Sequence, residues 1–109
     1  MIIPKLINYL SENLEVYVGM EAPNETEYVL IDQTGSSRQN HVITTSVAIQ
    51  SYGSTLYDAL VLNERVKNAM ADFVADEQVT RVQLDTDYNF TNTATKQFRW
   101  QAVFLITHY

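Results

Sequence analysis

The sequence predicts an α+β domain. A mixed, mostly antiparallel sheet packs against one long helix and a short N-terminal helix, in the order α-β-β-β-α-β-β. Three observations carry this prediction. Residues 54–76 repeat apolar side chains at helical spacing, residues 42–51 alternate as a strand does, and residues 100–108 are apolar at nearly every position. The length of 109 residues corresponds to one domain over 1–109.

The N-terminal segment predicts a short helix ending near Asn13, with Pro4 in the first turn, where proline is tolerated. Its apolar face comprises Ile3, Leu6, Ile7, Leu10 and Leu14. Residues 16–20 and 28–32 follow as strands, separated by a turn-rich acidic link over 21–27. Residues 34–40 contain no apolar side chain, so we expect a polar loop that is mobile in the isolated domain.

The third strand, 42–51, predicts two distinct sheet faces. One face looks like core and carries Ile43, Thr45, Val47 and Ile49. The other is small and hydroxylated, as in a half-exposed sheet face, and carries Val42, Thr44, Ser46 and Ala48.

The long helix is expected over 54–76, and Thr55 and Asp58 have the spacing of a capping box at its start. The apolar side of this helix carries Ala59, Leu62, Val66, Ala69, Met70 and Phe73, with Leu56 and Leu60 at its margin. A helix with so broad an apolar side needs a matching surface, which the predicted strands provide.

After this helix, residues 79–85 predict a strand and the middle of 86–99 a loop or hairpin tip. The apolar run 100–108 fits a central strand covered on both faces. Aromatic residues gather around the predicted loop, and we interpret them as core packing, with an interface as the alternative. They are Tyr88, Phe90, Phe98 and Trp100.

Composition excludes several classes of protein. The chain has no cysteine, so disulfide scaffolds, thiolate zinc sites and cysteine nucleophiles are excluded. A net charge of −6 with seven scattered basic residues argues against a module that binds duplex nucleic acid. We find no signal peptide and no stretch of transmembrane length, and therefore expect a soluble protein inside the cell.

No catalytic, cofactor or metal residues are expected. Asp85 and Asp87 lie on one predicted strand face, but a hard cation needs about six oxygen ligands. We interpret both as solvated acids. His41 is expected to open a strand and His108 to fray at its end, and two histidines without a paired nucleophile predict neither a metal site nor general-base catalysis.

Over essentially its whole length the sequence resembles the tail terminator, or tail-to-head joining, proteins of long-tailed bacteriophages. The resemblance rests on SYGSTLYDALVLNERVKNAM (51–70) together with DYNFTNTATKQFRWQAVFLIT (87–107). The opening segment 2–23 and YVLIDQTG (28–35) also fit. Head-completion (head-tail connector) and minor tail proteins have a similar size and α+β make-up and are the main alternative. A small ligand-binding domain or enzyme is a further alternative.

The resemblance implies a non-enzymatic virion protein, made in the host cytoplasm. It would form a homo-oligomeric ring, typically a hexamer, that stops polymerisation of the tail tube protein and docks to the head connector, without a membrane or specific nucleic acid. A closed ring needs two different patches per subunit. We expect two polar segments to order on contact, and we add Val61, a valine on the polar side of the long helix. The predicted interface residues are Thr34, Gly35, Ser36, Ser37, Arg38, Gln39, Asn40, Val61, Thr91, Asn92, Thr93, Thr95, Lys96 and Gln97.

Overall fold

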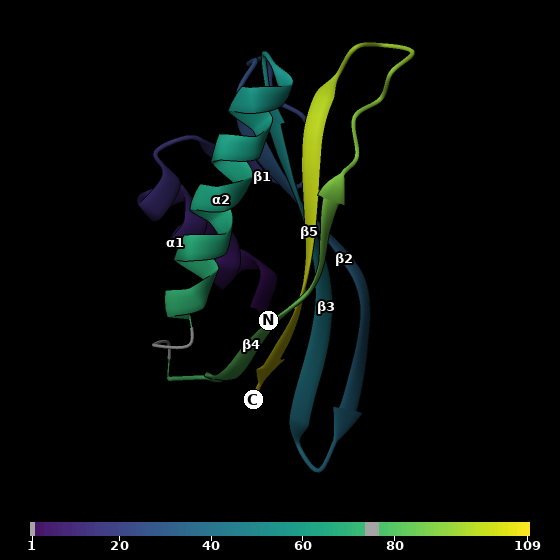
Figure 1. Cartoon of the computed structure of the whole chain (residues 1–109). Helices are drawn as coiled ribbons and strands as arrows, with labels where there is room; N and C mark the ends of the chain where they lie inside the picture. The colour runs from purple at the N-terminus through teal and green to yellow at the C-terminus, as the bar shows by residue number, and fades with distance from the viewer. Residues whose placement is uncertain (1, 74–76) are drawn as a thin grey trace.

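The computed structural model describes residues 2–73 and 77–109 and confirms the predicted fold class and element order (Figure 1). The strands form one sheet in the order β1-β2-β3-β5-β4, in which β1 and β2 are parallel and the other neighbours antiparallel. The elements are α1 (Ile2–Leu14), β1 (Tyr17–Gly19), β2 (Tyr28–Gln39), β3 (Val42–Gly53), α2 (Leu56–Asp72), β4 (Val79–Asn89) and β5 (Phe98–His108).

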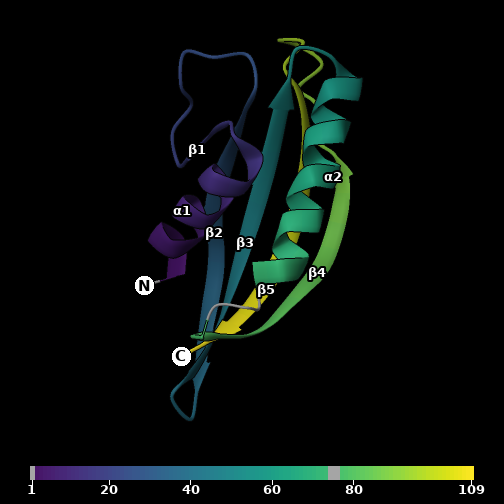
Figure 2. The ribbon, with the colours of Figure 1, turned by 90° about the vertical axis from the view of Figure 1, so that its left-hand side faces the viewer.

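Both helices cover the same face of the sheet, and they lie beside one another on it (Figures 1 and 2). We call this the helix face and the other the outer face. The buried core lies between the helices and the helix face, and its largest fully buried side chains include Leu6, Leu10, Ile31, Ile49, Leu62, Met70, Phe73 and Ile106. Neither helix in the described part of the chain is long and apolar enough to cross a membrane.

Helix α2 begins at the predicted cap. The side-chain oxygen of Thr55 accepts a hydrogen bond from the Asp58 backbone N–H at 3.0 Å. The helix has 17 residues, fewer than predicted, and positions 74–76 of the predicted helix lie outside the described residues. Of the predicted apolar side, Ala59, Leu62, Val66, Met70 and Phe73 are buried and Ala69 is half-buried. At its margin Leu60 is half-buried and Leu56 exposed, whereas the polar Asn63 is fully buried.

The predicted polar loop over 34–40 is wrong. Strand β2 continues to Gln39 and pairs with β3 up to Gln39 and Val42, so these residues form one arm of a long hairpin. The turn consists of Asn40 and His41, with φ of 52° and 68°. Two positive φ values in a two-residue turn match the right-handed twist of a hairpin. The arm lacks apolar residues because its side chains are exposed, while its backbone pairs with β3.

Two further predictions about strands need correction. Strand β4 runs past Asp85 to Asn89, so the predicted loop shortens to residues 90–97. Strand β5 lies between β3 and β4, as a central strand should, but helices cover only one of its faces. Its burial therefore alternates, with Ala102 and Phe104 buried on the helix face and Val103 and Leu105 half-buried on the outer face.

Candidate assembly interface

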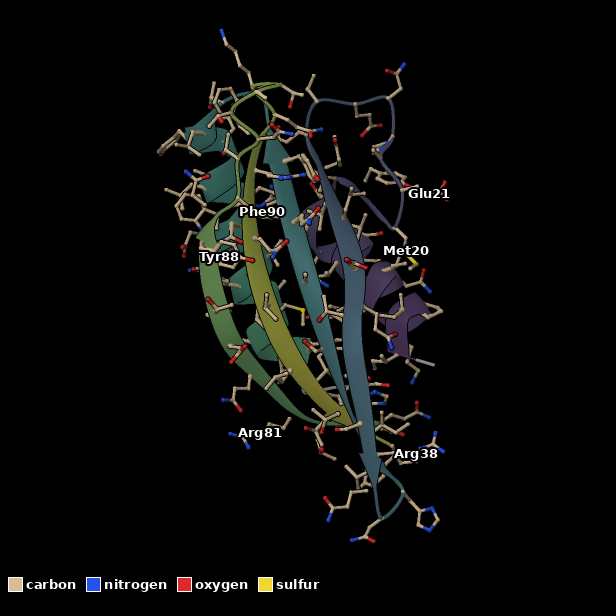
Figure 3. The ribbon with its side chains drawn as sticks, turned by 90° about the vertical axis from the view of Figure 1, so that its right-hand side faces the viewer. Met20, Glu21, Arg38, Arg81, Tyr88 and Phe90 are labelled. Carbon is tan, nitrogen blue, oxygen red and sulfur yellow. The ribbon has the colours of Figure 1, made fainter. Side chains whose placement is uncertain are left out.

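The outer face of the sheet has no helix over it (Figure 3). On the two central strands, β3 and β5, the only charged outward side chain is Arg99. The remainder are small, hydroxylated, amide or apolar, as predicted for β3, and Ala48 and Gln101 are buried. Solvated sheet faces are usually polar and charged, whereas depletion of charge is typical of the centre of protein interfaces.

Hydrogen bonds join the outward side chains across several strands. The hydroxyl of Tyr52 donates to Gln50 at 2.8 Å, and the Gln50 amide donates to Gln101 at 2.8 Å. Gln101 in turn donates to the Tyr88 hydroxyl. Arg99 donates to the Tyr52 hydroxyl at 3.2 Å. This network holds the amide and aromatic side chains in fixed positions, so the outer face is pre-organised near the start of β2 and the end of β4.

The aromatic residues predicted as core packing divide between the two faces. Tyr88 and Phe90 are each 39% exposed, and their rings meet edge to face at 5.8 Å. Arg99 lies over the Phe90 ring, 4.4 Å from its centre. Trp100 instead pairs with Ser51 on the helix face, where both are half-buried or buried. For Tyr88 and Phe90, therefore, the core prediction is wrong.

The two predicted contact segments lie at opposite ends of the molecule. The register pairs Ile43 with His108 at one end of the sheet and Gly53 with Phe98 at the other. The β2–β3 turn is at the first of these, which we call the hairpin end, and residues 90–97 are at the second, the loop end (Figure 1). The molecule measures 44 × 25 × 21 Å, and the strands run along its length in Figure 1.

At the hairpin end, the helix face of the sheet extends past the helices and leaves a groove of about 680 Å³. Its lining includes Ser36, Arg38, Ile43 and His108. His108 was expected to fray, and this is wrong: its side chain is buried and its Nε2 lies 2.9 Å from the Thr45 hydroxyl. Of the predicted interface residues, Thr34 to Gln39 are strand residues with exposed side chains, and Asn40 forms the turn.

At the loop end, residues 91–97 form a closed turn. The backbones of Asn92 and Gln97 exchange two hydrogen bonds of 3.1 Å, and the Asn92 side chain accepts from the backbone N–H groups of Ala94 and Thr95. Gln97 reaches the Tyr28 hydroxyl at 3.3 Å. A shallow groove of about 510 Å³ separates this turn from the link before β2, and its lining includes Glu25, Asn92 and Lys96.

Val61, the third predicted contact, lies on neither end. It is on the exposed side of α2 and 40% exposed, with Glu64 and Arg65 among its exposed neighbours along the helix. The structure therefore does not bring the predicted interface residues together into one patch. It separates them into a hairpin-end set, a loop-end set and a single position on the helix layer.

A polar cluster between α2 and the sheet was missed by the sequence analysis. Asp87 accepts hydrogen bonds from Asn63 at 2.8 Å, from Lys67 at 2.6 Å and from the Trp100 indole at 2.6 Å. A bulge between Leu84 and Thr86 explains why Asp87 is available. The extra residue turns Asp87 to the helix face, so it does not share a strand face with Asp85 as predicted.

The charges of this cluster stabilise one another. Burial by itself raises the pKa of the Asp87 carboxyl, but the hydrogen bonds from Lys67, Asn63 and Trp100 outweigh burial and hold the pKa below its usual value. The same bond to Asp87, together with the bond to Glu64, raises the pKa of Lys67. Lys67 forms ion pairs with Asp87 and Glu64, and the pair with Asp87 joins α2 to β4. Neither Lys67 nor Asp87 lines the groove at the loop end or the groove at the hairpin end. We call this cluster the clamp.

Among the described residues no three histidine, cysteine or acidic side chains gather as a metal site would require. Comparison of the chain with models of known protein families gives no match. Comparison with curated protein sequences gives none either.

Proposed function

We propose that this protein assembles with copies of itself into a ring on the end of a bacteriophage tail tube. There it stops further polymerisation of the tube and offers the surface to which the head connector joins. It acts by fitting against other proteins and transforms no substrate. The expected ring is a hexamer, and its partners are the tail tube protein, the head connector and its own copies.

The observation that carries the proposal is the placement of the two polar contact segments at opposite ends of an elongated subunit. A terminator must touch the tail on one side and the head on the other while its flanks touch neighbouring copies. With the strands along the ring axis, the hairpin end and the loop end point to opposite sides of the ring (Figure 1). The sheet edges and the outer face remain for contacts within the ring.

The two ends also differ in their pattern of charged side chains, which suits two different partners. The hairpin turn is flanked by Arg38, and Arg81 near the start of β4 is exposed toward the same end (Figure 3). Between Gln33 and Tyr57 Arg38 is the only charged residue in a chain of net charge −6. The loop end is mixed in charge, because Glu25 and Lys96 line the same groove there. Different patterns of charge at the two ends favour a fixed orientation between head and tail.

The test is a phage that lacks this protein, complemented by variants. Without the protein, electron micrographs should show overlong tails detached from heads. Arg38→Glu at the hairpin end and Lys96→Glu at the loop end should each leave the isolated subunit folded and block a different step, tail capping or head joining. Normal tails joined to heads in the absence of the protein would refute the proposal. So would a purely monomeric protein in native mass spectrometry with tail tubes present.

A further inference from the structure

Two edges of the sheet are open and face opposite flanks of the subunit. Strand β1 covers β2 only along Tyr28–Leu30. Beyond Leu30, β2 pairs only with β3 in the described part of the chain, so its other edge is free to Gln39. Strand β4 forms the opposite edge and pairs only with β5. Open edges present unpaired backbone N–H and C=O groups, which another strand can satisfy.

We propose that the free edge of β2 in one copy pairs with β4 of the next copy, so that a continuous antiparallel sheet runs from subunit to subunit. This inference rests on the self-association proposed above and names the two surfaces that form it. The occupant of each edge is a second copy of this chain. Because the two edges differ, the contact is heterologous and can close into a ring.

The directions of the two strands permit this pairing, and so do their positions along the strand axis, which we call their level. Successive antiparallel pairs from β2 through β3 and β5 make β2 and β4 antiparallel to one another. The register places Gly35–Ser37 of β2 level with Arg81–Gln83 of β4. Rotation about an axis along the strands changes neither direction nor level. A neighbour's β4 therefore meets the free β2 edge antiparallel, without sliding along the axis, and with its helices on the same side of the sheet.

An apolar side chain and an apolar groove occupy matching positions on the two edges. Leu84 of β4 pairs with Phe104 on the helix face, yet it is 43% exposed. Gln33 of β2 is level with Leu84 and lines a groove of about 340 Å³ on the helix face. Apart from Gln33 and Asn8, the groove is lined by the apolar Ile3, Pro4, Ile7 and Met20. In the proposed pairing Leu84 of one copy enters this groove of the next.

Pairing along these edges places no like charges directly opposite one another, because Arg81 faces Ser37. The facing β2 segment consists of Gly35, Ser36 and Ser37, which are small and uncharged. On β4, bulges lie before Arg81 and after Leu84 and leave a regular stretch of four residues between them. Bulges are a common means of limiting strand pairing at an edge. The contact is therefore short and defined, and Leu84 at its end adds the apolar anchor that a short backbone pairing needs.

Two aspartate substitutions test the side-chain part of the contact. Leu84→Asp and Met20→Asp each place a charge at the proposed contact, one on either side of it, and Met20 is 58% exposed in the isolated subunit. Each should leave the urea midpoint of the monomer almost unchanged while weakening self-association about tenfold or more, measured by native mass spectrometry and sedimentation. Tyr57→Asp, at a 71% exposed position on α2, is the matched control and should associate like the wild type.

Engineered disulfides test the strand pairing itself. The chain has no cysteine, so Gly35→Cys combined with Gln83→Cys can form only new bonds. A Cβ at Gly35 meets no atom within 4 Å. The two positions are on opposite edges of one subunit and come within disulfide reach only between paired copies. We expect a ladder of covalent oligomers under oxidation, and none from Gly35→Cys combined with Tyr57→Cys.

The outcomes separate this inference from the proposed function. Two results together would overturn the shared sheet. In the first, the oligomer persists in Leu84→Asp and Met20→Asp; in the second, Gly35→Cys combined with Gln83→Cys gives no covalent link between copies. The proposal of a ring would then still stand. A wild-type chain that stays monomeric with tail tubes present overturns both. Loss of association in the aspartate variants, together with the disulfide ladder, supports the shared sheet.

Discussion

Replacing Asp87 with alanine should destabilise the subunit far more than its position near the end of an edge strand suggests. Three donors lose their acceptor: Asn63, Lys67 and Trp100. Asn63 is completely buried, and its side-chain oxygen already lacks a partner among the described residues. Leaving a buried polar group without a hydrogen-bond partner costs about 1–3 kcal/mol, and a hydrogen bond to a charged group contributes about 1.5–3 kcal/mol to stability. Lys67 keeps its ion pair with Glu64 at 2.7 Å, which limits its share.

We therefore expect Asp87→Ala to lower the free energy of unfolding by about 3–5 kcal/mol, out of the total of about 5–15 kcal/mol typical of a domain. Urea denaturation followed by circular dichroism measures this difference. Asp85→Ala is the matched control, because Asp85 is exposed on the same strand, and its effect should stay within about 0.5 kcal/mol. A loss below about 1 kcal/mol for Asp87→Ala, or equal losses for the two variants, would refute the clamp.

The clamp also predicts a pH dependence. Because the pKa of Asp87 is lower in the folded chain than in the unfolded chain, the folded state binds this proton less tightly. The contribution of Asp87 is therefore complete above the ordinary carboxyl pKa of about 4 and disappears as the pH falls toward the folded value. The stability difference between the wild type and Asp87→Asn should shrink below about pH 4. A difference that stays constant down to about pH 2 would contradict the lowered pKa.

Three other perturbations have defined expected outcomes in the same denaturation assay. Gly53→Ala should lower the free energy of unfolding by about 2 kcal/mol or more, since the new Cβ would lie 2.6 Å from the Ala59 backbone nitrogen. Gly35→Ala is the control, because its Cβ meets open space and should leave the stability nearly unchanged. Equal effects of the two substitutions would contradict the close approach of β3 and α2. His41→Gly should stabilise the hairpin by about 1 kcal/mol, because its φ of 68° disfavours side chains, and an unchanged urea midpoint would count against this. Leu62→Asp should unfold the chain and Val61→Asp should not, since Leu62 is 1% and Val61 40% exposed.

Sequence periodicity predicted the elements whose faces differ in polarity, and it failed where both faces are alike. In β3 and α2, one side meets the core, so the spacing of Val47, Ile49 and Leu62 records the element type. The distal arm of β2 has exposed side chains on both faces, so Thr34 to Gln39 carry no alternation. Pairing with β3 makes this arm a strand, and such pairing is a tertiary effect that local composition does not record.

The candidate interface was predictable in composition but not in arrangement. The polar runs and the small face of β3 were evident from the residues, whereas their separation onto opposite ends depends on strand order. The cluster around Asp87 was not predictable, because it needs a bulge that reverses one side chain and a helix residue, Lys67, distant in sequence. Asn63 amid the apolar side of α2 was the one available signal, since a buried amide requires a polar partner.

The strand order also has a consequence for folding during synthesis of the chain. Strand β4 is joined to β3, and so to the rest of the sheet, only through β5, which follows every other described element along the chain. During synthesis, β5 therefore leaves the ribosome after α1, α2 and the remaining strands, and until then the edge of β3 that pairs with β5 has no partner strand. Folding of this chain therefore includes a β3–β5 pairing of large sequence separation, which slows folding.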